Sequence, residues 1–423
     1  FVKWIDNTGT EISTSDSLLN YIVSKDVTLR AIFRTHNFRI YANTSNIATK
    51  LESARTGDTL LLAAGTYSSG IAFQNGKVLT LMPDGSGSAI VTQQISPSGF
   101  AATNCGLVLS GLRINRSSDY FIYGDVANVK KIAFVNDTIE NINRCLIRTA
   151  NAGYTMDTIY FDNCIIRNCG NNGWSFIYPK HIVRNVIVQN STLYNYTAGE
   201  SFFYPNQTDN ANVLNFNFQN NTVYKWGKDN SRAICNSRNS YSTNSVYSFR
   251  NNIINEPGAT TLPMILNATG GSLSATKNLV NNYGSYVISN PVSSVIEDLT
   301  LVGLGLSSVG YTDATNGNFS ISETSPIATA GVDGAVLGDP RWIKKSTGNA
   351  FLSENEVSFY VQNNTAKLIN LTAKSIVNVY SIEGKLLFKT IVTGTEMLLP
   401  VRNRIFIVQI TDTRKITNLK VIL

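Results

Sequence analysis

The chain has 423 residues, of which 43% are hydrophobic and 15% charged, and its formal net charge is +7. The Lys and Arg residues are spread along the chain in runs of no more than two, which argues against a nucleic-acid-binding protein. Only two histidines are present, so a metal site built from several histidines is excluded.

The residue types favour an all-β protein with a large core. Tyr and Phe number 19 each, and Asn, Ser and Thr carry much of the polarity. Of the five cysteines, Cys164 and Cys169 flank a predicted core strand, and we expect them to be buried thiols, although a disulfide between them stays open. No CxxC pair occurs, so a zinc ribbon is not supported. No stretch is long and apolar enough to span a bilayer.

Residues 1–35 are predicted to form a short β unit. Residues 1–13 read as a strand, an Asn-Thr-Gly turn and a second strand, and residues 26–33 alternate as a strand does. With its aromatic-Trp opening and its TLRAIF close, the unit resembles the small surface repeat of internalin-like and Bacteroides proteins. The resemblance implies a spacer or adhesive module without chemistry.

Residues 39–67 carry the most specific pattern in the chain. Ile47, Leu51 and Ala54 are spaced as on the apolar face of a helix, and GDTLLLAAGTY follows from Gly57. An amphipathic helix is well suited to cover the open end of a solenoid. This combination resembles the N-terminal cap of pectate-lyase-like β-helix proteins. The resemblance implies a right-handed parallel β-helix, which we expect over residues 36–345.

A repeated strand motif in residues 100–290 supports the same fold. The motif begins at Leu109 and recurs with offsets of 25, 27, 27, 30, 31 and 26 residues. The intervals hold short strand-like runs and polar turns without a helical pattern, so an α/β barrel is not supported. The sequence therefore predicts two or three strands in each rung, a rung being one full turn of the solenoid.

The third position of the motif is asparagine in most rungs. We expect these side chains to lie in one column along the solenoid and to form a hydrogen-bonded structural ladder, in preference to binding calcium or sugar. The column consists of Asn136, Asn163, Asn190, Asn220 and Asn251.

The sixth and seventh positions predict an inner and an outer column. The sixth position is apolar in every rung and includes Ile166 and Leu193, so it is predicted to be core. The seventh position includes Arg167, Tyr194 and Tyr224, and strand alternation predicts that it faces solvent.

The segments after the repeat carry two further resemblances. Residues 316–342, which end in GDPRW, resemble the closing segment of secreted Bacteroidetes β-helix proteins. Residues 346–423 are predicted to form a separate β-sandwich, and VYSIEGKLL and the final KVIL resemble the sorting domain of the type IX secretion system. The glycine usual before the penultimate strand is missing, and Arg402-Asn403-Arg404 stand there instead. Together these resemblances imply a secreted or outer-surface protein.

The outer column predicts a binding face for an acidic polysaccharide. Neighbouring rungs place equivalent residues about 4.8 Å apart, so an extended glycan meets one side chain in each rung. Aromatic rings beside cations suit an anionic sugar chain. Alternatively, outward tyrosines are ordinary strand residues. The candidate substrate-binding residues are Arg167, Tyr194, Tyr224, Lys225 and Trp226.

For an enzyme of this kind, the expected reaction is β-elimination on a uronic acid. A base removes the proton beside the carboxylate, and a cation, either calcium or Lys/Arg, offsets the charge that develops. The basic cluster after Tyr224 supplies the candidate catalytic residues Lys228, Arg232 and Arg238. A solvated basic loop is the alternative explanation of this cluster.

The segment AGESFFYPN, from Ala198, resembles the Gly-Glu-Ser element of alginate lyases and chondroitinase-B-type enzymes. Those enzymes continue with a catalytic Lys and then an Arg on the next rung. Here no Lys follows between Glu200 and Val223, and Arg232 or Arg238 corresponds to the Arg of the next rung in those enzymes. The missing Lys puts a direct transfer of that mechanism in doubt.

Other hydrolytic mechanisms find little support. No two Asp residues are adjacent, so the paired carboxylates of a pectin hydrolase are not evident. His181 lies in the strand-like KHIVRNVIV, and nothing near it resembles a nucleophile elbow. We therefore expect a secreted or surface monomer that acts on acidic polysaccharide as a lyase. A non-catalytic glycan-binding or scaffold β-helix is the alternative. No metal ligand is assigned, and the cofactor stays open, with calcium as a candidate.

Overall fold

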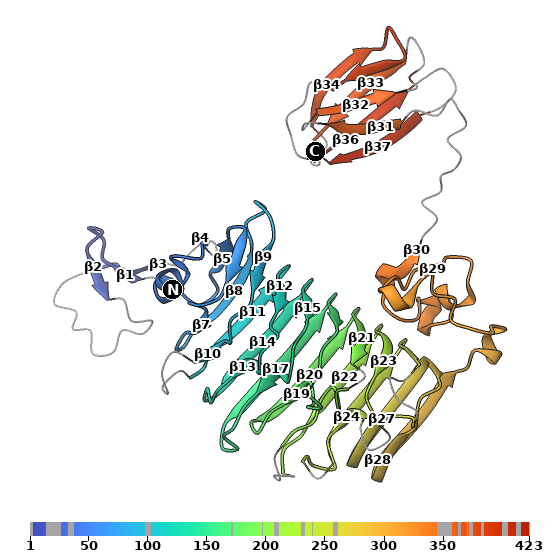
Figure 1. The fold of residues 1–423 in the computed structure, drawn as a ribbon. Coiled ribbons are helices and arrows are strands. Elements are labelled where there is room, and N and C mark those ends of the chain that lie inside the picture. The colour runs from blue at the N-terminus through green and yellow to red at the C-terminus, as the bar shows by residue number, and fades with distance from the viewer. Residues whose placement is uncertain are drawn as a thin grey trace. The chain divides into compact units, whose positions relative to one another are not determined.

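The computed structural model describes residues 3–13, 27–32, 38–97, 103–170, 172–196, 198–206, 211–229, 233–238, 240–256, 261–344, 358–362, 365–369, 371, 375–381, 385–399, 405–411 and 416–422. Residues 1–344 form one compact unit and residues 345–423 another. The first unit contains the predicted right-handed parallel β-helix, in which three parallel sheets wrap around one core (Figure 1). No helix in these residues is long and apolar enough to cross a membrane.

The three sheets are here called A, B and C, in the order in which the chain passes through them before it returns to sheet A. Sheet A contains β4 (Arg39–Ala42), β5 (Thr59–Leu62), β8 (Val78–Pro83), β11 (Gly106–Ser110), β14 (Val129–Val135), β17 (Thr155–Asp162), β20 (Ile182–Gln189), β22 (Asn215–Gln219) and β25 (Val246–Arg250). Sheet B contains β6 (Gly65–Tyr67), β9 (Ala89–Val91), β12 (Arg113–Asn115), β15 (Thr138–Glu140), β18 (Ile165–Arg167), β21 (Thr192–Tyr196), β23 (Thr222–Trp226) and β26 (Ile253–Asn255).

Sheet C is the least regular of the three. It contains β7 (Ala72–Phe73), β10 (Ser96–Pro97), β13 (Tyr120–Tyr123), β16 (Cys145–Arg148), β19 (Ile177–Tyr178) and β24 (Ala233–Asn236). Isolated bridges join Ile177 to Phe203 and Phe203 to Cys235, so the sheet continues between β19 and β24. The last two strands, β27 (Met264–Asn281) and β28 (Tyr286–Leu299), pair in parallel.

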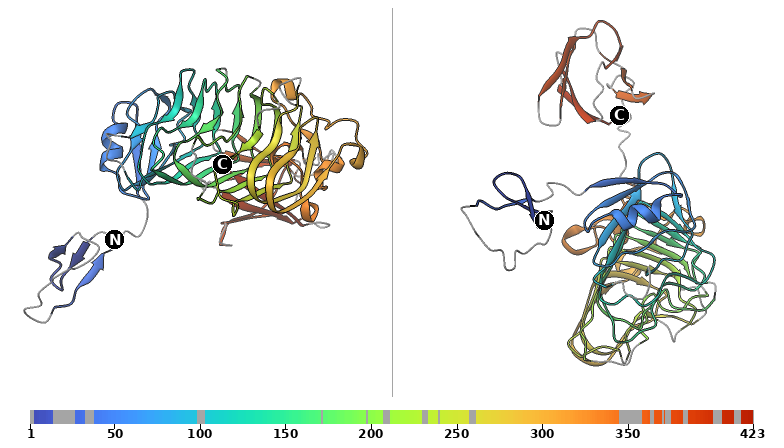
Figure 2. Two further views of the ribbon diagram at one scale, coloured as in Figure 1. Left: turned by 90° about the horizontal axis from the view of Figure 1, so that it is seen from below. Right: turned by 90° about the vertical axis from the view of Figure 1, so that its left-hand side faces the viewer.

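The predicted cap helix is confirmed as α1 (Ile47–Ser53), which lies at one end of the solenoid (Figure 2). Its apolar face buries Ile47 and Leu51, and Ala54 follows at 1% exposure. The helix has only seven residues, so its stability comes from this burial and not from its length.

The predicted asparagine column is confirmed, and its main cause is backbone geometry. Each of its five residues occupies the corner between sheets A and B with φ from 51° to 56°. This left-handed conformation strains most residues and is tolerated best by Gly and Asn. Gly111 and Lys277 hold the same position in two further rungs, at φ 70° and 56°. The side chains form only part of the expected ladder, because Asn190 bonds Asp162 and not Asn163.

The inner column is core, as predicted. Ile166 is fully buried and Leu193 is 1% exposed. Aromatic rings continue the packing along the axis, since Phe134 and Phe161 of successive rungs stack with ring centroids 4.9 Å apart. All five cysteines are buried and none forms a disulfide, so the prediction of buried thiols at Cys164 and Cys169 is confirmed.

Residues 300–344, here called the closing segment, contain short 3₁₀ helices and two short strands. These elements are η1 (Val302–Leu304), η2 (Ala314–Asn316), β29 (Ile321–Ser322), η3 (Pro326–Ala328), η4 (Val332–Gly334), η5 (Pro340–Trp342) and β30 (Ile343–Lys344). Their apolar residues pack against the outer face of the last rungs, where Ile327 and Leu337 meet Ile253 and Leu279.

Two antiparallel modules complete the fold. The N-terminal module pairs β1 (Lys3–Ile5) with β2 (Glu11–Ser13) and β3 (Arg30–Ile32). The C-terminal unit has one sheet of β31 (Ser358–Gln362), β32 (Thr365–Ile369) and β35 (Glu396–Leu398), and a second sheet of β33 (Ile376–Tyr380), β34 (Leu386–Ile391), β36 (Ile405–Thr411) and β37 (Ile416–Ile422). Leu368 of the first sheet packs with Val377 and Val408 of the second, which is the predicted β-sandwich.

Candidate functional site

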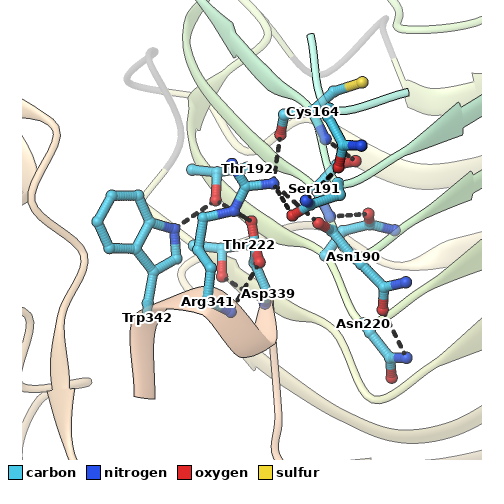
Figure 3. A network of polar contacts seen from close by, with 12 residues as sticks. Cys164, Asn190, Ser191, Thr192, Asn220, Thr222, Asp339, Arg341 and Trp342 are labelled. Atoms are coloured by element: carbon cyan, nitrogen blue, oxygen red, sulfur yellow. Dashed lines mark hydrogen bonds and ion pairs between the residues drawn. The ribbon is translucent and has the colours of Figure 1, made fainter. Parts of the chain in front are cut away.

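The closing segment is clamped onto the outer face of sheet B by the GDPRW sequence (Figure 3). Asp339 is buried, and its carboxylate accepts a hydrogen bond from the Thr192 hydroxyl at 2.7 Å. The Asp339 N–H donates to the Thr222 hydroxyl at 3.0 Å, and Trp342 Nε1 donates to the Thr192 hydroxyl at 2.6 Å. A Cβ on Gly338 would lie 2.6 Å from the Thr222 hydroxyl, so only glycine allows this approach.

Arg341 extends the clamp to the asparagine corner. Its guanidinium donates to the Asn163 side chain at 2.7 Å and to the carbonyl of Asn190 at 3.2 Å. It also pairs with Asp339 at 2.7 Å. Burial raises the pKa of Asp339, and the charge of Arg341 opposes that rise only in part. The Asp339–Arg341 pair and its hydrogen bonds to the rungs thus fix the closing segment over sheet B.

This clamp overturns the prediction that Tyr194 and Tyr224 face solvent. Alternation does point both rings away from the solenoid core, but each is only 5% exposed. Phe319 of the closing segment covers them, with ring centroids 5.1 Å from Tyr194 and 5.6 Å from Tyr224. The two rings are thus packed in a second small core and do not form an open platform for a glycan.

The other predicted binding residues are dispersed. Trp226 is 2% exposed and stacks on Tyr196 inside the solenoid, with centroids 4.3 Å apart, so its predicted place on the outer face is wrong. Lys225 occupies the next corner with φ 52°, and its ammonium lies 5.1 Å from the Tyr224 ring centroid. The αL conformation turns the chain between Tyr224 and Trp226, which explains their opposite directions.

Arg167 remains on the outer face but is held by Glu140. Two guanidinium nitrogens of Arg167 donate to Glu140 Oε2 at 2.9 and 2.7 Å, and Arg113 pairs with Oε1. Burial alone would raise the pKa of Glu140, but the bonds from both arginines outweigh it and lower the pKa. Arg167 also donates to the Tyr194 hydroxyl at 3.4 Å. Its main structural task is therefore to neutralise a buried carboxylate.

Two of the three predicted catalytic residues, Lys228 and Arg238, lie in the part of the chain that the structure describes. Lys228 lies 3.6 Å from Glu200 Oε1, on the sheet C side of the solenoid. Arg238 is exposed just after β24. Arg232 lies outside the described residues. His181 is fully buried, and its two ring nitrogens lie 2.9 and 3.0 Å from backbone carbonyl oxygens, so it is structural.

The outer face of sheet C carries a site that the sequence reasoning missed. Four consecutive rungs place Tyr123, Arg148, Tyr178 and Tyr204 in one outward row. The Tyr178 and Tyr204 rings stack with centroids 5.5 Å apart, and the Arg148 guanidinium lies 4.6 Å from the Tyr178 centroid. None of these four side chains is buried. The Arg148 cation thus lies between Tyr123 on one neighbouring rung and Tyr178 on the other.

A second row lies beside the first. The Arg144 guanidinium lies 5.6 Å from the Tyr120 ring centroid and 5.1 Å from that of Trp174. Trp174 in turn meets Tyr178 edge to face at 5.6 Å, which links the two rows. We call these seven residues the sheet C face. It comprises Tyr120, Tyr123, Arg144, Arg148, Trp174, Tyr178 and Tyr204.

Glu200 adjoins the sheet C face on the rung of Tyr204. Its carboxylate accepts from the Ser175 hydroxyl at 3.5 Å and pairs with Lys228. Burial raises the pKa of Tyr178, and the positive charge of Arg148 partly offsets this rise. Tyr178 is therefore a neutral hydrogen-bonding ring at physiological pH. Among the described residues, no cluster of three or more His, Cys, Asp or Glu side chains is placed to hold a metal ion.

Comparison with known proteins adds little beyond this geometry. No family model matches the chain. A search of curated proteins finds no match either. Among solved structures, the chain is similar to a mutant of a PL6-family alginate lyase, with 15% sequence identity and a TM-score of 0.44. The similarity covers 70% of this chain and 42% of the lyase chain.

Proposed function

We propose that this protein binds an acidic polysaccharide along the sheet C face. The observation that supports the proposal most directly is that Arg144 and Arg148, which lie on one rung, are flanked by partly exposed aromatic rings on the rungs before and after it. Strands of successive rungs lie about 4.8 Å apart, so the four rungs span about 14 Å, enough for several sugar units. The rings offer apolar contact to sugar faces, and the guanidinium groups pair with carboxylates.

Lys228 adds a basic group beside the sheet C face. Its amino nitrogen lies 3.6 Å from Glu200 Oε1, and its side chain is 34% exposed. We therefore assign Lys228 to the binding of a substrate carboxylate.

The test of this proposal is a titration with uronic-acid oligosaccharides. We expect a Trp174→Ala, Tyr178→Ala double variant to lose at least about tenfold in affinity, since each stacked ring contributes about 1 kcal/mol. The matched control is Tyr41→Ala, because Tyr41 is 67% exposed on β4 of sheet A, away from the proposed face. An unchanged affinity in the double variant, or equal binding of a neutral oligosaccharide, contradicts the proposal.

Cleavage by β-elimination is the second candidate function. It is favoured by the same pair, because Glu200 supplies a carboxylate that accepts a proton and Lys228 supplies the cation for the developing charge. The assay follows the ultraviolet absorbance of the unsaturated product over a panel of uronic-acid polymers. Loss of turnover with retained binding in Glu200→Gln, Arg232→Ala or Arg238→Ala supports a lyase. Binding without turnover on every polymer favours a non-catalytic module.

The flanking parts fit an extracellular setting for this activity. We propose residues 1–35 as a spacer and the β-sandwich of residues 346–423 as a sorting-type domain, so that the protein acts outside the cell or on its surface. Cell fractionation with and without residues 346–423 tests this: loss of export on deletion supports a sorting role, and unchanged export contradicts it.

A further inference from the structure

A second column of polar side chains runs inside the solenoid, directly after the corner residues. Its members are buried at the point where the chain turns from sheet A into sheet B. At this corner the backbone N–H of each rung has to find a side-chain acceptor on the next rung. The column consists of Asp137, Cys164, Ser191, Asn221, Asn252 and Asn278, each exposed by 1% or less.

The asparagines of this column both accept and donate. Asn252 Oδ1 accepts from the Asn221 N–H at 2.9 Å, while Asn252 Nδ2 donates to the Phe218 carbonyl at 2.7 Å. Asn278 repeats the pattern one rung later, with Oδ1 accepting from the Asn252 N–H at 3.1 Å and Nδ2 donating to the Phe249 carbonyl at 3.0 Å. Each corner therefore uses one acceptor and one donor from the same side chain.

The other end of the column keeps the same arrangement with different residues. Cys164 turns its thiol to the Phe134 carbonyl, with Sγ 3.3 Å from the oxygen. Ser191 accepts from the Cys164 N–H at 3.0 Å and donates to the Gln189 carbonyl at 2.7 Å. A donor directed at a backbone carbonyl is thus present whether the residue is Asn, Ser or Cys.

Asp137 holds the equivalent position and meets only half of this requirement as a carboxylate. Its Oδ1 accepts from the Leu112 N–H at 2.7 Å, as an asparagine Oδ1 would. Its Oδ2 is buried and makes no hydrogen bond to any residue that the structure describes. By the register of the column, Oδ2 takes the place of an amide Nδ2, whose acceptor is a carbonyl of the preceding rung.

Among the residues that the structure describes, no cation pairs with Asp137. The titratable group that faces it is the Cys164 thiol of the next rung, which is neutral. Arg341 approaches that rung from the closing segment, but it bonds the Cys164 carbonyl at 3.3 Å and forms its ion pair with Asp339. A buried carboxylate without a counter-charge is costly, and taking up a proton relieves the cost.

We propose that Asp137 is a protonated carboxylic acid in the folded protein at neutral pH, and that its Oδ2–H replaces the amide donor that asparagines supply on later rungs. Burial raises the pKa of Asp137 to about 8, while the hydrogen bond from the Leu112 N–H opposes the rise. In the unfolded chain the same group ionises near about pH 4. Folding thus takes up one proton between these two values.

This proton uptake makes the stability of the folded protein depend on pH. Below about pH 4 both states are protonated, and the contribution of Asp137 to stability is fully present. As pH rises toward about 8, only the unfolded state releases the proton, so the folding equilibrium constant falls about tenfold per pH unit from this group. Above about 8 the loss is complete.

The test compares the full-length protein with Asp137→Asn, which supplies a permanent donor of the same shape. Denaturant unfolding across about pH 4 to 9 should show the variant gaining on the wild type by about tenfold in folding equilibrium constant per pH unit, until the gain levels off near 8. The reverse change, Asn221→Asp, should create a similar dependence three corners further along. A gain that does not vary with pH overturns the proposal.

A spectroscopic readout gives a second test that does not depend on unfolding. The wild type at neutral pH should show the infrared carbonyl band of a protonated carboxyl group, and Asp137→Asn should lose intensity in this band. If the band is absent from the folded wild type, or if its intensity is the same in the variant, Asp137 is not a protonated group.

Discussion

The carboxylate of Asp339 accepts a hydrogen bond at 2.7 Å from the hydroxyl of Thr192, which lies 147 residues earlier in the chain. The same hydroxyl accepts from Trp342 Nε1, and Arg341 reaches the neighbouring corner. These contacts join the closing segment to rungs formed by much earlier parts of the sequence. Sheet B consequently has an outer face that is covered over its last rungs.

Asp339→Ala should weaken the whole closing segment. The change removes a buried acceptor and leaves Arg341 without its carboxylate, so we expect the free energy of unfolding to fall by about 3 kcal/mol. Urea denaturation measures this. The control is Asp333→Asn, which removes a 90% exposed negative charge from the same segment, keeps a residue that tolerates the left-handed φ of 56°, and should change stability by less than about 0.5 kcal/mol. Equal losses in the two variants would show that the contacts of Asp339 contribute no more to the free energy of unfolding than an exposed carboxylate does.

Leu193→Ala and Tyr194→Ala should both be costly, although strand alternation alone predicts that only the first is. Leu193 lies in the solenoid core, and its truncation should cost about 2–5 kcal/mol. Tyr194 packs under Phe319 at 5% exposure, so its truncation should cost about 3–5 kcal/mol. Thermal or denaturant melts compare them. A near-neutral Tyr194→Ala would mean that the closing segment leaves this face open in solution.

On the sheet C face, Arg148→Ala and Trp174→Ala should weaken glycan binding in different ways. Loss of Arg148 removes a charge term that salt screens over about 10 Å at 0.1 M, so the defect should shrink at high salt. Loss of Trp174 removes apolar contact, so its defect should be nearly the same at both salt concentrations. Titrations of an acidic oligosaccharide at low and high salt distinguish the two. Identical salt profiles would count against a mixed ionic and stacking site.

The five cysteines should be unreactive in the folded protein. All are buried, and burial raises the pKa of Cys105 to about 11 and that of Cys145 to about 12, so the thiolate is scarce at neutral pH. A colourimetric thiol reagent should therefore titrate no thiol before denaturation and all five after it. Rapid reaction of one thiol in the native state would identify a rung that opens locally.

Local patterns predicted the solenoid well. The period of the motif, the apolar sixth position and the cap helix each follow from short-range spacing, and the structure places Leu193 and α1 as expected. The asparagine column was also located correctly, but its cause is the positive φ at the corner more than the side-chain ladder. A column of Asn with an occasional Gly, such as Gly111, is the sequence signal of that backbone geometry.

The predicted ligand face failed because alternation decides only whether a residue points in or out. Tyr194 does point outward, but covering by Phe319 depends on contacts more than 100 residues apart, which no local pattern contains. The sheet C face was missed because its residues follow no regular local pattern. Its strands are short and irregularly spaced, so Trp174 and Tyr178 do not fall at a fixed position of the repeat. The sequence YFIY beside CLIR offered a signal, since aromatic and basic residues end neighbouring strands.

The corner between sheets A and B also determines how the chain accommodates changes in length. Five residues separate the start of the motif from its core position in every rung, as from Leu109 to Ile114 and from Phe218 to Val223, while whole rungs range from 25 to 31 residues. All of that variation therefore lies on the path from sheet B back to the next sheet A. Evolution and engineering alike have freedom there: a peptide tag or a whole folded domain inserted on this path should be tolerated, whereas a single extra residue at the corner would shift every later strand out of phase with its neighbours.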